Sequence, residues 1–290
     1  LTSTQALGKV RRFLNAQKAG HAGTLDPLAS GVLPIALGEA TKTISLIQDT
    51  LKTYSFTIAW GEQRDTDDCE GQVIATSEAR PTRAAIEAAL PAYIGEIEQI
   101  PPQYSAIKID GQRAYDLARE GETVDIQPRP VYIERLELLA ARPDEADFTM
   151  TCGKGTYVRS LARDLGRDLG CLGYIKALRR EAVGGFCADR AISLDKIEEF
   201  GKSADLNSVL LPLQSVLDDI PALSLKPEEA ARLRSGQMLS FVSRPDFERL
   251  SKAGLGHGEI TTALALCQDN PVALVDVEGP SIRPVRVLNM

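Results

Sequence analysis

Asp26 is the residue whose place in the sequence best suits a nucleophile. It lies within residues 20–34, GHAGTLDPLASGVLP, which hold too many glycines and prolines for a helix interior or a central strand. Pro27 disfavours helical dihedral angles at Asp26 and keeps its backbone extended. A carboxylate has an ordinary pKa of about 3.9, so it can attack at neutral pH without an activating base. Aspartate before proline is also common in turns, and the dipeptide alone favours that interpretation.

A second group of candidates lies on a helix predicted over 156–169. Its apolar residues recur at helical spacing, and Arg159, Arg163 and Arg167 follow one another at intervals of four on another face. A solvated row of charges is the plain interpretation. Arg159, however, falls in the first turn, where a cation opposes the helix dipole, which makes a purely solvated role less favourable for it.

Further elements that must position these residues follow from periodicity and capping signals. Alternating apolar and polar residues and strand-like composition predict strands over 51–60, 131–140, 146–152 and 183–192. A helix is expected from Thr82, its N-cap, to about Leu90. Residues 193–217 are expected to be helical and acidic.

The chain is predicted to form two domains that meet near Ile220–Pro221. We expect a catalytic domain over 1–220 and a small β-barrel over 221–290. Four prolines, at positions 101, 102, 128 and 130, bracket a segment that we interpret as a substrate-gripping lobe over 101–130, with a short charged helix around 112–120.

The C-terminal part carries its own signals for helix and strand. A short helix is expected to start at Pro227 and to stop at Gly236. Short strands follow, the last two over 272–278 and 281–288. These alternations suit a small β domain.

The charge of the chain first argues against a nucleic-acid partner. Its net charge is −7 and its pI is near 5.1, whereas binding of phosphates usually requires a basic face. The basic residues nevertheless gather locally, at Arg11, Arg12, Lys18, Arg159, Arg163, Arg167, Arg179, Arg180, Arg283 and Arg286. On composition alone, a mixed solvated surface explains these clusters equally well.

Composition excludes several classes of protein. A chain of 290 residues with 43% hydrophobic and 25% charged residues is an ordinary globular protein. Five cysteines without CxxC spacing and only two histidines, His21 and His257, disfavour a disulfide framework and a metal centre. No segment reaches the about 20 apolar residues that span a bilayer, and no signal pattern opens the sequence, so we expect a cytoplasmic protein.

Residues 20–42 resemble the active-site motif of the TruB family of tRNA pseudouridine-55 synthases almost residue for residue. Residues 101–106, PPQYSA, resemble the start of the thumb insertion of that family. Three more motifs match in the family's order: Lys52-Thr-Tyr54, Lys154-Gly-Thr-Tyr157-Val-Arg159, and Leu178-Arg179-Arg180 followed by Val183-Gly184 and Phe186. The resemblance covers about residues 2–190 and is weaker in the C-terminal tail.

The resemblance implies an α/β (α+β) pseudouridine synthase fold. Its central sheet is mixed, largely antiparallel and flanked by helices, and a small C-terminal β-barrel is loosely similar to a PUA RNA-binding module. The family usually carries an Asp-Lys-Pro strand before the residues that Leu1-Thr2-Ser3 match. Two interpretations are open: the sequence is part of a longer chain, or it is a natural truncation with a weakened site. The implied reaction turns uridine into pseudouridine at position 55 in the T-loop of tRNA, without metal or organic cofactor. We expect a monomer.

The resemblance assigns the catalytic roles to Asp26, Arg159 and Tyr54. Asp26 is the nucleophile, and Arg159 keeps its carboxylate charged and oriented. Tyr54 stacks on the target base and assists removal of the C5 proton. Because Tyr54 alternates with Phe56 and Ile58 on one face of a strand, it also fits plain core packing.

Substrate binding is assigned to His21, Tyr157 and Leu178 together with Tyr54. His21 is expected to insert into the T-loop and to hold the uridine flipped out, because the target base is stacked within folded RNA. Tyr157 and Leu178 are expected against the bound uridine, although both also suit packing in the core.

Two other functions fit the same motifs. The chain could be a tRNA-binding folding chaperone for which catalysis is incidental, or a guide-RNA-dependent rRNA pseudouridine synthase that acts in a ribonucleoprotein. The acidic pI and the lack of basic extensions disfavour the guide-RNA-dependent relative.

Overall fold

The computed structural model describes most of the chain, and the described residues form two compact units. The described residues are 1–105, 108–109, 112–113, 125–202, 209–213 and 220–289. The first unit comprises Leu1–Ala6, Ala22–Pro34 and Leu46–Ala191, and the second comprises Leu7–His21, Ile35–Ser45 and Ile192–Met290. These units do not test the predicted boundary between two domains near residue 220, which stays a prediction.

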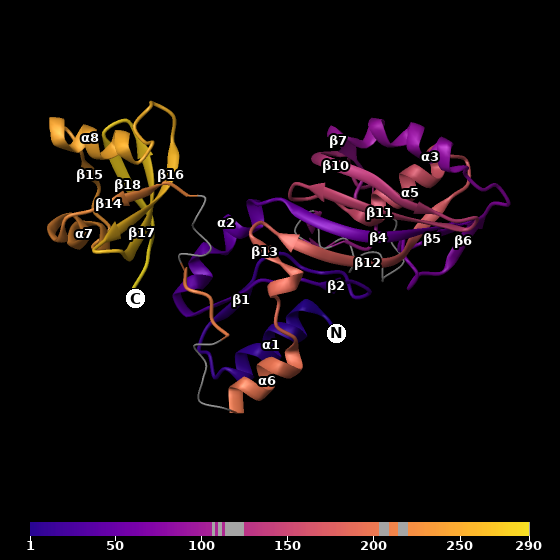
Figure 1. Cartoon of the computed structure of the whole chain (residues 1–290), viewed down its shortest axis with the longest axis horizontal. Coiled ribbons are helices and arrows are strands. Elements are labelled where there is room, and N and C mark those ends of the chain that lie inside the picture. Colours follow the sequence, from indigo (N-terminus) through magenta and orange to yellow (C-terminus); the bar gives the residue numbers. More distant parts are fainter. Residues whose placement is uncertain (106–107, 110–111, 114–124, 203–208, 214–219, 290) are drawn as a thin grey trace. The chain divides into compact units, whose positions relative to one another are not determined.

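A mixed sheet is the centre of the first unit (Figure 1). Its order is β13-β12-β4-β11-β10-β7, and β2 pairs with β12. That pair is parallel and the others are antiparallel, which confirms the expected mixed, largely antiparallel sheet. The strands are β2 (Ser30–Gly31), β4 (Lys52–Trp60), β7 (Gly95–Gln99), β10 (Arg129–Ala141), β11 (Glu145–Cys152), β12 (Gly173–Val183) and β13 (Phe186–Cys187).

Helices complete the core of this unit. In α3 (Arg83–Ala89), Thr82 is the N-cap, as predicted, and accepts a hydrogen bond from the Ala85 amide at 3.1 Å. A short 3-10 turn, η2 (Leu90–Tyr93), follows. The helix predicted over 156–169 is α5 (Val158–Asp168), whose Leu161 and Leu165 lie in the cluster of buried residues that β4, β11 and β12 also supply. Burying such a leucine contributes about 1.5–3 kcal/mol, so this packing fixes α5 against the sheet.

Strand β12 corrects one prediction of the sequence. Strand was expected over 183–192, but β12 ends at Val183, and η3 (Ala188–Arg190) follows the short β13. The register of β12 against β4 shifts between Ile175 and Ala177 and again between Arg180 and Ala182. Each bulge interrupts the alternation of side chains between the two faces of the sheet. The sequence of β12 therefore lacks the period of two that marks a strand.

Two small hairpins extend from this unit. Strand β5 (Glu62–Arg64) pairs with β6 (Val73–Thr76) around a turn that holds the acidic residues of 65–70. Strand β8 (Lys108–Ile109) pairs with β9 (Gln112–Arg113). The helix expected around 112–120 is wrong at Gln112–Arg113, because these residues join a hairpin, and the rest of it lies outside the described residues.

The second unit contains a five-stranded sheet that curls into a half-barrel, in the order β14-β16-β17-β18-β15. Its core includes Leu233, Val275, Val277 and Ile282. The unit comprises parts of α1 (Ser3–Phe13) and α2 (Ile44–Asp49), together with β1 (Ala19–His21), β3 (Ile35–Leu37), η1 (Gly38–Thr43), α6 (Leu194–Lys202), β14 (Ala222–Ser224), α7 (Pro227–Arg234), β15 (Leu239–Ser240), α8 (Arg244–Lys252), β16 (Thr261–Cys267), β17 (Asn270–Glu278) and β18 (Ser281–Val287).

The predicted helix from Pro227 and the last two strands are confirmed as α7, β17 and β18. Helix α8 was not predicted, although Ser243 and Asp246 form a capping box at its start. In the part of the chain that the structure describes, no helix is both long and apolar enough to cross a membrane.

Candidate active site

Asp26 lies on a loop that is anchored at several points, all within the first unit. The Leu25 amide donates to the hydroxyl of Ser3 at 2.8 Å, and the Ala22 amide donates to the Pro34 carbonyl at 3.0 Å. The Asp26 carbonyl itself accepts a bond from the Ala29 amide at 2.9 Å. The segment is irregular, as its glycines and prolines predict, but its backbone groups are bonded and its conformation is therefore defined.

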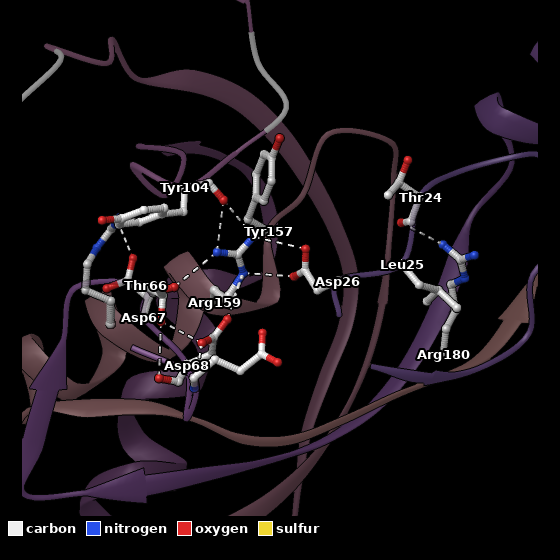
Figure 2. A network of polar contacts seen from close by, with 12 residues as sticks. Thr24, Leu25, Asp26, Thr66, Asp67, Asp68, Tyr104, Tyr157, Arg159 and Arg180 are labelled. Carbon is white, nitrogen blue, oxygen red and sulfur yellow. Dashed lines mark hydrogen bonds and ion pairs between the residues drawn. The ribbon is translucent and has the colours of Figure 1, made fainter. Parts of the chain in front are cut away.

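The carboxylate of Asp26 forms a two-pronged ion pair with Arg159 (Figure 2). Nε of Arg159 donates to Oδ2 at 2.8 Å and Nη2 donates to Oδ1 at 3.0 Å. The side chain of Arg159 is 5% exposed and that of Asp26 is 30% exposed. A fork-to-fork pair fixes the plane of the carboxylate, and the exposure leaves Asp26 accessible to a substrate while Arg159 stays buried.

Further bonds hold the guanidinium of Arg159 in place. Nη1 donates to the carbonyls of Thr66 at 3.0 Å and Tyr104 at 3.2 Å, and Nη2 also donates to Tyr104 at 3.2 Å. A second carboxylate, that of Asp68, lies 3.7 Å from Nε and is as deeply buried as Arg159. Arg159 is thus bonded on several sides, and its orientation determines that of Asp26.

The turn that supplies Thr66 and Asp68 was not recognised from the sequence. Several residues of 65–70 are acidic, and two of them, Asp67 and Asp68, are buried. This turn is tied to β12, because the Ile175 amide donates to the Asp67 carbonyl at 3.0 Å and the Cys69 amide donates to the Ile175 carbonyl at 2.9 Å. The signal that could have revealed it is the pair of adjacent acids, Asp67 and Asp68, which can form ion pairs with two arginines on α5.

Asp67 pairs with the second arginine of that row. Nη1 of Arg163 lies 3.2 Å from Oδ2 of Asp67, Nε lies 2.8 Å from Asp164, and Nη2 donates to the carbonyl of Ile100 at 2.7 Å. Burial raises the pKa of the Asp67 carboxyl to about 6, and Arg163 and Arg159 oppose that rise. In the row Arg159, Arg163 and Arg167, the solvated interpretation therefore holds only for Arg167.

Tyr54 lies on β4, opposite Met150 of β11 and Arg180 of β12. It packs against the hydrophobic core and is partly buried. Burial raises the pKa of its hydroxyl to about 12, Cys152 adds to the rise, and the nearby Arg180 opposes it. The phenol is therefore protonated at neutral pH.

Tyr157 and Leu178 are both described residues of the first unit. Tyr157 precedes α5, and its main chain is held from both sides by the buried side chain of Gln99, which accepts from the Tyr157 amide at 2.8 Å and donates to the Tyr157 carbonyl at 3.1 Å. Figure 2 shows Tyr157 beside the Asp26–Arg159 pair. Leu178 is a buried residue of β12 opposite Phe56. Gln99 was not predicted from the sequence.

His21, the remaining predicted site residue, is half-buried at the end of β1, opposite Ile35 of β3 in the second unit. In the described part of the chain, no group of three or more histidine, cysteine or acidic side chains is placed to hold a metal ion.

Three of the clustered basic residues are buried, so the interpretation as a mixed solvated surface does not hold for them. Arg159, Arg163 and Arg180 are 5%, 8% and 1% exposed. They are therefore not available to phosphates, and a basic surface must be formed by the other residues of the clusters.

Comparison of the sequence with known proteins gives matches to one family. A model described as TruB family pseudouridylate synthase (N terminal domain) matches residues 11–158, and one described as tRNA pseudouridylate synthase B C-terminal domain matches residues 159–218. The chain is 53% identical to the tRNA pseudouridine synthase B of Bradyrhizobium diazoefficiens, covering 100% of this chain and 83% of that protein. It is 50% identical to that of Caulobacter vibrioides, covering 100% and 93%.

Two solved structures share the fold at lower identity. A chain of a Cbf5-Nop10-Gar1 complex superposes with a TM-score of 0.74 at 23% identity, over 100% of this chain and 82% of that one. A chain of an H/ACA RNP bound to a substrate RNA containing 2′-deoxyuridine gives 0.71 at 20%, over 100% and 82%. The sequence matches, with which the fold agrees, define a pseudouridylate synthase, which is an isomerase. Within that class, the chain belongs to the TruB family.

Proposed function

We propose that this enzyme isomerises uridine to pseudouridine at position 55 in the T-loop of tRNA, with Asp26 as the nucleophile. The observation that carries the proposal is the two-pronged pair of Asp26 with the buried Arg159. The relatives that are about half identical over the whole chain carry the name tRNA pseudouridine synthase B, which supports tRNA as the substrate.

The reaction sets clear demands on this site. The N1–C1′ glycosidic bond must break, the uracil must turn, and a C5–C1′ bond must form, while C5 loses a proton and N1 gains one. A carboxylate that attacks the nucleotide holds one fragment covalently while the bond is exchanged. Arg159 fixes the direction of that attack because it holds both oxygens of Asp26 from a buried position.

The remaining residues suit recognition of a flipped base. A phenol with a pKa of about 12 offers a stacking face at neutral pH and not a ready phenolate, so we propose stacking on the uracil as the role of Tyr54. Tyr157 and Leu178 would line the pocket for the base, and His21 would hold the T-loop open. The curled sheet of the second unit supports the assignment of 221–290 as a PUA-like RNA-binding domain.

Replacement of Asp26 by asparagine tests the proposal, because the side chain keeps its shape and loses its nucleophilic oxygen. With a tRNA transcript, Asp26→Asn should form no pseudouridine at position 55 while its affinity for the transcript stays within about twofold of the unaltered protein. Product formed by Asp26→Asn, or modification only at other uridines, would overturn the proposal.

The same assay separates the other two functions. Turnover of an isolated T-stem-loop by the purified chain excludes a need for a guide RNA. A chain that binds and refolds tRNA but makes no product at all would instead be a folding chaperone.

A further inference from the structure

Arg180 is the largest of the fully buried side chains in the described part of the chain, and the chemistry proposed above assigns it no part. It lies on β12 and is 1% exposed. A guanidinium retains its charge in a protein, so taking it out of water is costly unless its donors are satisfied. Its bonding partners therefore indicate what it does.

The guanidinium of Arg180 donates to main-chain carbonyls on both sides of Asp26. Nε donates to Val32 at 2.8 Å and Nη2 to Gly23 at 3.0 Å. Nη1 donates to Thr24 at 3.4 Å (Figure 2). Gly23 and Thr24 precede Asp26 by three and two residues, and Val32 follows it. One rigid fork thus joins the two limbs of the loop that presents the carboxylate.

The main chain of Arg180 makes the same connection. Its carbonyl accepts a hydrogen bond from the Val32 amide at 2.9 Å, while its side chain donates to the Val32 carbonyl. Val32 directly follows β2, which runs parallel to Arg179 and Arg180. Two independent sets of bonds from one residue therefore fix the downstream limb.

The glycines of the loop fit this close approach. Gly31 has φ of +102°, and a Cβ there would lie 2.1 Å from the Arg180 carbonyl oxygen. Gly23 has φ of +91°, and a Cβ there would lie 3.3 Å from Nη1 of Arg180. Both limbs of the loop reach Arg180 at positions where a side chain would obstruct them.

We propose that Arg180 is a positioning residue for the reaction, which sets the conformation of residues 23–32 so that Asp26 meets Arg159 and the nucleotide in the reactive geometry. This inference rests on the proposed function, in which Asp26 is the nucleophile. Because its side chain is 1% exposed, Arg180 acts through the loop backbone.

Single-turnover kinetics with saturating tRNA test this role in three full-length variants. Arg180→Met should lower the rate constant of product formation by about 100-fold, the scale expected when a reactive group is displaced by about 1 Å. Arg180→Lys keeps the charge but cannot reach both limbs at once, so its rate constant should fall between those of Arg180→Met and the unaltered protein. Arg135→Met removes an arginine that is 64% exposed on β10, and it should leave the rate constant unchanged.

The affinity for tRNA and the folding of the variants distinguish a positioning role of Arg180 from a general role in folding. The dissociation constants for tRNA of the Arg180 variants should stay within about twofold of the unaltered protein, because the binding surface is retained. A purely structural role would lower affinity together with the rate. If Arg180→Met does not fold, Arg180→Lys decides: a folded Lys variant with an unaltered rate constant overturns the proposal.

The result for Asp26→Asn keeps the two proposals distinguishable. An active Asp26→Asn variant would remove the proposed function whatever Arg180 does. An inactive Asp26→Asn variant combined with full rates for both Arg180 variants would overturn only the positioning role.

Discussion

At the scale of single residues, burial divides the site into a fixed part and a reactive part. Arg159 and Asp68 are 5% exposed by side chain, whereas Asp26 is 30% exposed. The cation is therefore held by buried groups, and the carboxylate that it orients remains accessible. Removal of the carboxylate would leave the buried guanidinium of Arg159 without its main charged partner, which is destabilising.

Asp67 gives this site a predictable dependence on pH. Its carboxyl has a pKa raised from 3.8 to about 6 by burial, which means that the folded protein binds this proton more tightly than the unfolded chain. As pH rises from about 4 to about 6, the free energy of unfolding should fall by up to about 2–3 kcal/mol through this residue. Urea unfolding of the protein and of Asp67→Asn between pH 4.5 and 7.5 measures the effect.

The comparison of the two proteins removes the contributions of all other titrating groups. Asparagine does not titrate, so the difference in unfolding free energy between the proteins should change across the window and become constant above about pH 7. Parallel profiles would show that the proton on Asp67 is bound equally in both states. The prediction would then be wrong.

At the scale of elements, the regular parts of the site follow from the sequence and the irregular parts do not. Strand β4 and helix α5 keep their periods of two and 3.6 residues, so the elements of Tyr54 and Arg159 were predicted. Strand β12 carries two bulges, and the acidic turn around Asp67 is held by long-range bonds to Ile175. Neither feature leaves a periodic pattern in its own segment.

The site residues show the same limit. The resemblance selects Asp26 and Arg159, and the structure brings them together within one unit. The resemblance does not reveal that Gln99 holds Tyr157 or that Arg180 is buried. A polar residue in the sequence does not show whether its partner is water or a distant carbonyl.

The junction of β2 with β12 provides a test of the loop's architecture. Gly31→Ala places a methyl group against the Arg180 carbonyl and imposes a φ that costs a non-glycine residue about 1–3 kcal/mol before the overlap is counted. We expect the free energy of unfolding to fall by at least about 2 kcal/mol. Gly185→Ala is the matched control, because a Cβ there meets no atom within 4 Å and its φ is not positive.

Both variants can be compared in one denaturation series. Gly185→Ala should change the free energy of unfolding by no more than about 0.5 kcal/mol. Equal effects of the two substitutions would contradict the close packing of β2 against β12, because glycine would then have no special role at position 31.

At the scale of the whole molecule, an acidic protein must bind a polyanion through local charge. The sequence has 40 acidic and 33 basic residues, and three of the clustered arginines are buried. The acids are also engaged in the site, because Asp26, Asp67 and Asp68 face buried arginines and do not add to a repulsive surface. These three acids and the three buried arginines cancel one another, so the remaining residues still carry the net charge of −7. A phosphate backbone must therefore be bound by the exposed basic clusters.

The salt dependence of tRNA binding tests this view. Each phosphate contact contributes about −0.7 to −0.9 to the slope of log K against log salt concentration, so four or more contacts predict a slope of about −3 or steeper. Arg283 and Arg286 on β18 are exposed members of the clusters. Arg283→Gln/Arg286→Gln should make the slope shallower by about one for each contact that is lost.

Asp26→Asn serves as the control, because it alters the proposed nucleophile and leaves the exposed clusters intact. Its slope should equal that of the unaltered protein, since counterion release depends on phosphate contacts and not on the reacting carboxylate. A flat salt response in all of the proteins would mean that clustered basic residues do not outweigh the net charge of −7. Recognition of tRNA would then have to come from stacking and shape, which depend far less on salt.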